Sequence, residues 1–104
     1  MTRLTVIYWR DIPAQVVGQQ GRRRHRQELP PRFAVAIDRA AMRAGRGSSS
    51  AYLEDWRRST RRCEGDLAAA VRYEAERLEA DFPDQRLEAL VKAGGRMPSG
   101  GETP

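Results

Sequence analysis

The most concentrated chemistry in the sequence is a run of cationic residues, Arg22-Arg23-Arg24-His25-Arg26. Guanidinium groups at this density could bind phosphate, and each contact would add to a salt-dependent affinity. The plainer interpretation, which we favour, is a solvated loop on an arginine-rich protein. The four arginines, Arg22, Arg23, Arg24 and Arg26, are therefore candidate anion- or nucleic-acid-binding residues, with a hydrated loop as the alternative.

A second group of candidate residues combines aromatic rings with arginine. Trp9 and Arg10 lie near the start of the chain, and Trp56, Arg57 and Arg58 lie near its middle. Trp and Arg dominate the energetics of protein interfaces, and a flat guanidinium can stack on a ring while it binds a carboxylate. These five residues are the first choice for a partner-binding surface. The competing interpretation is that the rings simply pack in the core.

Catalytic chemistry has little support in this sequence. His25 has no triad or metal-ligand set around it, and Cys63 has neither a resolving cysteine nor an evident base beside it. There is no phosphate loop, dinucleotide fingerprint or metal-ligand spacing. Four acids of one predicted helix are expected on its solvated face: Glu74, Glu76, Glu79 and Asp81. We therefore expect no enzyme activity, cofactor or metal.

The elements that position these residues begin with two strands. Residues 3–9 are apolar on both alternating faces, which is typical of a strand inside a sheet, and residues 14–20 form a second extended run. The break at Asp11-Ile12-Pro13 is too short for a crossover helix, so the two strands should pair antiparallel. Gly18 indicates a bulge or a close approach. Residues 22–26 would be a loop or a ragged edge strand.

Helical patterns follow further along the chain. Helices are predicted over about residues 31–44, from a cap at Asp66 to about 81, and from a cap at Asp84 to about 93. Residues 51–58 are ambiguous: we favour a third strand because two strands rarely make a stable sheet, and a helix capped by a serine is the alternative. Residues 57–62 would continue as a basic edge or turn.

These elements predict one α+β domain over residues 1–95. Its order is β-β-α-β-α-α, with an antiparallel sheet of about three strands, helices packed on one face, and a flexible tail over residues 96–104. The single cysteine excludes an internal disulfide, and no apolar run approaches the roughly 20 residues that span a bilayer. We expect a cytoplasmic protein that does not contact membranes.

Charge is unevenly distributed along the chain. Residues 1–62 carry 14 arginines and 5 acids, a net +9, whereas residues 63–104 carry 5 basic and 9 acidic residues, a net −4. A basic half that carries the sheet therefore joins an acidic helical half, and the molecule should have a large dipole.

Three segments, Tyr8–Val16, Ala36–Met42 and Tyr52–Arg58, resemble the small bacterial "virulence factor" domain family. The resemblance extends over roughly residues 2–95. It implies no catalytic residues, because the family has none established that could be carried over. Relatives are associated with gene clusters for corrinoid- and folate-dependent one-carbon transfer, so the resemblance implies an accessory role there as one alternative.

Three functions compete on this basis. The favoured one is a non-catalytic accessory or adaptor protein that docks on a larger cytoplasmic protein through Trp9, Arg10, Trp56, Arg57 and Arg58. A nucleic-acid-binding module would explain the basic N-terminal half, but the acidic helices and the missing motif count against it. An enzyme is the least favoured of the three.

Overall fold

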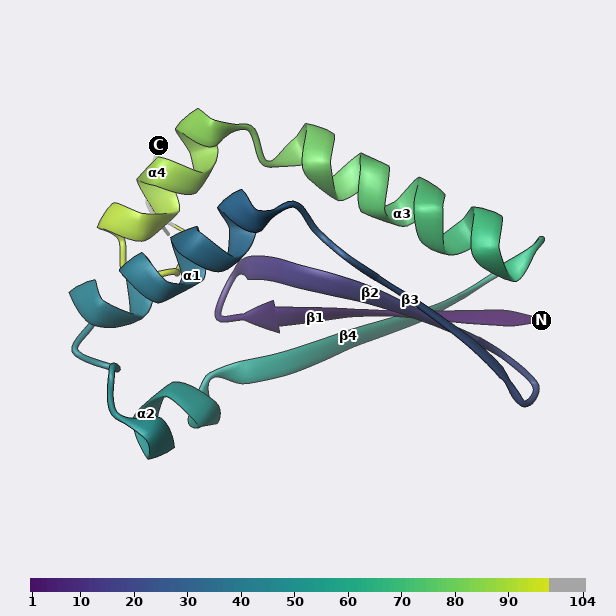
Figure 1. The fold of residues 1–104 in the computed structure, drawn as a ribbon, viewed down its shortest axis with the longest axis horizontal. Helices are drawn as coiled ribbons and strands as arrows, with labels where there is room; N and C mark the ends of the chain where they lie inside the picture. The colour runs from purple at the N-terminus through teal and green to yellow at the C-terminus, as the bar shows by residue number, and fades with distance from the viewer. Residues whose placement is uncertain (98–104) are drawn as a thin grey trace, which may run out of the picture.

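An antiparallel sheet of four strands carries the fold across residues 1–97, which are the residues that the computed structural model describes (Figure 1). The elements, in chain order, are β1 (Thr2–Trp9), β2 (Ile12–Gln20), β3 (Arg23–Glu28), α1 (Pro31–Arg43), α2 (Ser49–Glu54), β4 (Trp56–Cys63), α3 (Leu67–Asp81) and α4 (Asp84–Lys92). The α+β class is therefore confirmed, with one more strand than expected. Most of the predicted tail, residues 98–104, lies outside the described residues.

The spatial order of the strands is β3-β2-β1-β4. β1 lies inside the sheet, as its two apolar faces predicted, and it pairs antiparallel with both β2 and β4. Figure 1 shows α1, α3 and α4 on one side of the sheet, with α2 set apart at the end where β1 ends and β4 begins. One face of the sheet is thus covered by helices.

The core lies between the sheet and the helices α1, α3 and α4. Leu4 and Val16 of the sheet, and Val71 and Leu78 of α3, are all buried. Gly18 faces the same helix, where an added Cβ would lie 2.5 Å from Cγ2 of Val71. The glycine therefore marks a close approach, one of the two roles predicted for it. The bulge lies elsewhere, at a register shift between Ile7 and Tyr8.

The region around residues 51–58 differs from the favoured prediction. Its first part is the helix α2, whose N-cap Ser48 accepts a hydrogen bond from the Ala51 amide at 3.4 Å. The strand begins only at Trp56, and it continues to Cys63 because β1 offers a partner along its whole length, from Trp9 opposite Trp56 to Thr2 opposite Cys63. The predicted strand over 51–58 is therefore wrong in its first half, and the serine-capped helix is correct there.

The structure also tests the predictions for the basic run and for the caps of α3 and α4. The basic run joins the edge strand β3, paired with β2, rather than forming a loop. α4 begins at Asp84 with Pro83 at its N-cap, so Asp84 is in the first turn rather than at the cap. Asp66 caps α3 as predicted, because its side chain accepts a hydrogen bond from the Ala69 amide at 3.0 Å.

Candidate functional site

The first two predicted partner-binding residues lie inside the protein. Trp9 is 0% exposed, its Nε1 donates to the Tyr52 carbonyl at 2.9 Å, and its ring stacks on the Tyr52 ring at 5.9 Å. Arg10 donates from Nε to Oδ2 of Asp55 at 3.1 Å and from NH1 to the Gly94 carbonyl at 3.0 Å. Both residues therefore join the β1–β2 turn to α2 and to the end of α4, and Trp9 presents no surface to a partner.

The other three predicted partner-binding residues differ in burial and in the side of the sheet that they face. Trp56 is half-buried and lies edge-on to the Tyr52 ring at 5.7 Å. The Arg57 guanidinium lies 4.3 Å from the centre of the Tyr8 ring, and its Nε donates to the Arg10 carbonyl at 2.8 Å. Arg58 is exposed, and it points to the other side of the sheet because successive side chains of a strand alternate. The five residues do not form one exposed patch.

Asp55 is the acidic centre of this structural cluster. It accepts from Arg10 at 3.1 Å and from Arg46 at 2.9 Å, and its side chain is 13% exposed. Burial acts to raise the pKa of the Asp55 carboxyl, but the hydrogen bonds and charges of Arg46 and Arg10 together outweigh it and lower the pKa. Asp55 therefore favours its charged form and serves as the counter-charge of Arg10 and Arg46.

The face of the sheet that carries no helices is the more informative surface. Leu4, Val6 and Gly18 point toward α3, so their alternating neighbours point away from it. Cross-strand register assigns the matching residues of the other strands to the same side, and the Thr5 and Thr60 hydroxyls meet at 2.9 Å there. We call this surface the open face: Arg3, Thr5, Ile7, Val17, Gln19, Arg24, Arg26, Arg58, Thr60 and Arg62. The same register places Gln15 and Glu28 at one end of this side, where Gln15 and Trp56 share a hollow with Ile7 and Arg58.

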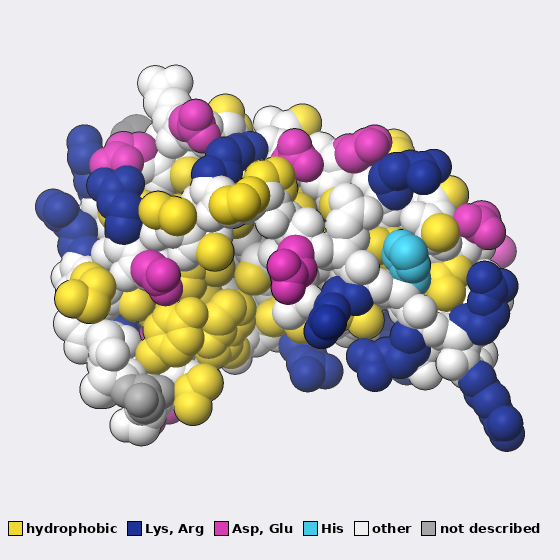
Figure 2. Space-filling model, in the orientation of Figure 1, with side chains coloured by type: hydrophobic (Ala, Val, Ile, Leu, Met, Phe, Trp, Pro, Cys, Tyr) yellow, Lys and Arg dark blue, Asp and Glu magenta, His cyan; other side chains and the backbone are white. Residues whose placement is uncertain are grey.

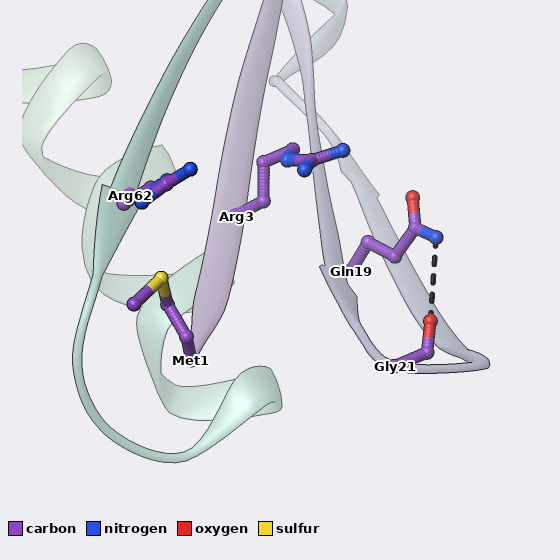
Figure 3. Close-up of a pocket in the computed structure, with 5 residues that line it drawn as sticks. All are labelled: Met1, Arg3, Gln19, Gly21 and Arg62. Carbon is purple, nitrogen blue, oxygen red and sulfur yellow. Dashed lines mark hydrogen bonds between the residues drawn. The ribbon is translucent and has the colours of Figure 1, made fainter.

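Two adjoining hollows lie on the open face. One, of about 310 Å³, extends from Ile7 and Arg58 across to Arg24. The other, of about 320 Å³, lies at the end of the sheet, where Figure 3 shows Arg3 and Arg62 extending over the same space as Gln19. Arg3 and Gln19 line both hollows. A single elongated partner could therefore occupy them together.

The open face holds five arginines that lack a carboxylate partner within residues 1–97, and others off this face, such as Arg22 and Arg72, also lack one there. Other arginines, such as Arg10, Arg39 and Arg61, do have a carboxylate within 3.1 Å. Within residues 1–97, none of the arginines of the open face forms such an ion pair, namely Arg3, Arg24, Arg26, Arg58 and Arg62. Figure 2 shows Lys and Arg side chains gathered at the lower edge of the molecule, beneath β3 and β4.

Arg3 and Arg62 are the pair of this surface whose mutual repulsion a bound anion would relieve most directly. They are direct partners in the β1–β4 register, and like charges opposite each other destabilise a strand pair. Arginines on edge strands are also a common defence against unwanted strand pairing. That explanation suffices for β3 and β4 but not for Arg3, which belongs to the interior strand β1.

The predicted anion-binding run is divided by strand alternation. Arg24 and Arg26 lie opposite Gln19 and Val17 and so belong to the open face. Arg23 lies opposite Gln20, on the other side, and Arg22 is in the turn before β3. Arg3 and Arg62 were missed by the sequence prediction. The spacing of Arg58, Thr60 and Arg62 by two residues was the available signal, but it had meaning only once this segment was known to be a strand.

Groups that could carry chemistry are scattered. Cys63 ends β4 and is half-buried, and His25 is exposed on β3. Among residues 1–97 there is no group of three or more His, Cys, Asp or Glu side chains placed to hold a metal ion. In the same part of the chain, none of the helices has the length and apolar character needed to cross a membrane.

One acid of α3 departs from its predicted place. Glu74 is 2% exposed, and it accepts from Arg61 at 2.7 Å and from Arg77 at 2.6 Å. The prediction that Glu74 lies on the solvated face of its helix is therefore wrong. Arg61 points from β4 toward the helices, and the Glu74 carboxylate is its ion-pair partner there. Arg61 is thereby neutralised, in contrast to its neighbour Arg62 on the open face.

Comparison with known protein families gives a match that covers most of the chain. A family model described as "Virulence factor" matches residues 7–91, most of the chain. Neither a curated protein nor a solved structure shows significant similarity to the sequence.

Proposed function

The chain belongs to the virulence factor family, and we propose that it is a non-catalytic accessory protein that docks on a larger cytoplasmic protein through its open face. The observation that carries this proposal is the set of five arginines without carboxylate partners among the described residues, with Arg3 directly opposite Arg62. An acidic surface on the partner would supply the missing counter-charges. From the original aromatic and arginine group, Arg58 lies on this face and Trp56 lines a hollow at its end.

A protein partner is favoured by what lies between the arginines. Ile7 and Val17 are half-buried near the centre of the face, and charged side chains surround them. An apolar centre with a polar rim is the usual anatomy of a protein interface. Proteins that bind single-stranded nucleic acid generally add several aromatic rings on which bases stack, whereas Trp56 is the single aromatic residue among those that line the three hollows on this side. Arginine also forms two parallel hydrogen bonds with a carboxylate, which gives such docking its geometry.

Nucleic acid is the second candidate, because rows of unpaired arginines on a sheet would also neutralise phosphates. The alternative role in corrinoid- or folate-dependent methyl transfer stays a prediction from the family resemblance. Nothing in the geometry of the open face selects it.

The proposal is tested with two variants that remove the same charge. Arg58→Gln/Arg62→Gln removes two arginines from the open face. Arg22→Gln/Arg72→Gln removes two exposed arginines that lie off it and form no ion pair within the described residues. Each protein is immobilised and exposed to nuclease-treated lysate of the native host. We expect the wild type and the Arg22/Arg72 variant to retain the same protein partner and the open-face variant to lose it.

Other results would contradict docking on a protein. If nuclease treatment releases the bound material, or if the bound material is RNA or DNA, nucleic-acid binding replaces the proposal. If both variants lose the partner equally, general charge rather than the open face is responsible.

A further inference from the structure

A groove that adjoins one end of the open face has the opposite electrostatic character. It lies between α1, α2 and β2, has a volume of about 190 Å³, and is bounded by Gln15, Glu28, Ile37, Asp38, Tyr52 and Trp56, which we call the acidic groove. Figure 2 shows hydrophobic side chains gathered between α1 and α2, with acidic side chains along the rim above them. The groove is therefore apolar at its base and negative at its edge.

The two carboxylates of the rim are available to a ligand. Glu28 and Asp38 are exposed, and within residues 1–97 neither forms an ion pair, although the chain is rich in arginine. Burial, and then the negative charge of Asp38, raise the pKa of the Tyr52 hydroxyl. The field of that carboxylate thus extends to the aromatic side of the groove.

Aromatic rings and an amide complete the lining. The Tyr52 and Trp56 rings meet edge to face at 86°, and electron-rich ring faces attract cations. Gln15 Oε1 is buried and has no hydrogen-bond partner among the described residues. A buried acceptor without a donor is unfavourable, so a ligand that supplies an N–H group here would be stabilised.

We propose that the acidic groove binds the guanidinium group of an arginine side chain from a partner protein. The groove is smaller than the roughly 300–1,000 Å³ of typical small-molecule sites, so one long side chain suits it better than a cofactor. Guanidinium is the cation that combines stacking on rings, several N–H donors and paired hydrogen bonds to carboxylates. The groove would therefore recognise a basic residue, whereas the open face recognises acids.

The test is an NMR titration of the full chain with N-acetyl-arginine amide. N-acetyl-citrulline amide serves as the matched neutral probe, because it has nearly the same shape without the charge. We expect saturable shifts of the Trp56 indole N–H and the Gln15 side-chain amide with the arginine probe, and weaker binding of citrulline. Asp38→Asn and Glu28→Gln should each weaken arginine binding roughly two- to fivefold, the loss typical of an exposed charge pair.

Controls separate this site from general charge and from folding defects. Glu76→Gln removes an exposed acid from α3, away from the groove, and should bind the arginine probe as the wild type does. Equal binding of arginine and citrulline, tighter binding of N-acetyl-lysine amide, or unchanged binding by the Asp38→Asn/Glu28→Gln double variant would each overturn the proposal. Because the test uses no partner protein, its result is independent of docking at the open face.

Discussion

Arg10 shows how one residue joins distant parts of this chain. Its φ of 53° is in the left-handed region, which is uncommon for a residue other than glycine. Its amide donates to the Asp55 carbonyl at 3.0 Å, its carbonyl accepts from Arg57, and its side chain reaches Asp55 and the Gly94 carbonyl. These contacts over-determine the turn and so hold the strained backbone in place.

The buried carboxylate of Glu74 leads to a prediction at the same scale. Burial acts to raise its pKa, but the hydrogen bonds and charges of Arg77 and Arg61 outweigh burial and lower it. Replacing the carboxylate with an amide in Glu74→Gln removes the counter-charge of Arg61 and one of the two carboxylates that pair with Arg77, which keeps Asp81 at 2.9 Å. We expect the free energy of unfolding at pH 7 to fall by about 1–3 kcal/mol, measured by urea denaturation.

The pH dependence of that loss follows from the direction of the pKa shift. The pKa of Glu74 is lower in the folded than in the unfolded protein. The carboxylate therefore stabilises the fold at pH values above the ordinary Glu pKa of about 4.3, and this stabilisation is lost as the pH falls through the lowered pKa of the folded protein. The difference between wild type and Glu74→Gln should therefore shrink toward pH 3. The same difference at pH 7 and pH 3 would contradict this account, and Glu76→Gln, exposed on the same helix, should change little at either pH.

At the scale of elements, α3 is the helix that packs on β2 and β3. Its buried face consists of Leu67, Val71, Ala75 and Leu78 with the buried Glu74, and it meets the sheet at Gly18 without an intervening side chain. This close approach places Arg61 of β4 within reach of Glu74. Packing of one helix thus decides which side of β4 is neutralised and which side stays charged.

Truncating the apolar face of α3 measures this packing. Leu78 is 2% exposed, so Leu78→Ala should lower the free energy of unfolding by about 2–5 kcal/mol, through lost burial and the cavity that remains. Tyr73→Ala, at a position 66% exposed on the same helix, is the control and should change stability by about half a kcal/mol or less. An effect of Leu78→Ala as small as that of the control would show that the apolar stripe of α3 does not form the core.

At the scale of the whole molecule, two surfaces of opposite charge lie on one small protein. The open face carries arginines without counter-charges in the described part of the chain, and the acidic groove carries free carboxylates beside Tyr52 and Trp56. Trp56 also lines a hollow with Ile7 and Arg58, so the groove adjoins one end of the open face. A partner that extends over both surfaces would need acidic groups against the open face and a basic group in the acidic groove.

Clustering of charge on the open face can be measured without any partner. Arg58→Gln/Arg62→Gln and Arg22→Gln/Arg72→Gln each remove two positive charges from the net +5. On a heparin column, the open-face variant should elute at a lower NaCl concentration than the Arg22/Arg72 variant, because adjacent arginines bind a polyanion together and release more counterions. Elution of both variants at the same salt concentration would show that the positive charge acts as a diffuse whole.

Several features of this protein follow from local sequence alone. The antiparallel pairing of β1 with β2 was predictable because two extended runs are joined by a short break. The turn itself is Arg10-Asp11, however, and the predicted break at Ile12 and Pro13 is wrong, since both residues belong to β2 and pair with β1. The extent of α3 was predictable because Asp66 caps it and its apolar residues recur at helical spacing. Both signals lie within a few residues of the structure they specify, and the family match covers the same stretch of chain.

Tertiary structure decided the surfaces. Arg58 points to the open face and Arg57 to the Tyr8 ring only because Trp9 lies opposite Trp56, a register between segments far apart in the chain. A slip of one residue would exchange the two faces of β4 and bury the arginines that now lie free. The burial of Trp9 and Glu74 has the same cause, since α2, α3 and the end of α4 must first be packed around the sheet. Residue types predicted which side chains could bind, and packing over long sequence distances determined which of them are exposed to do so.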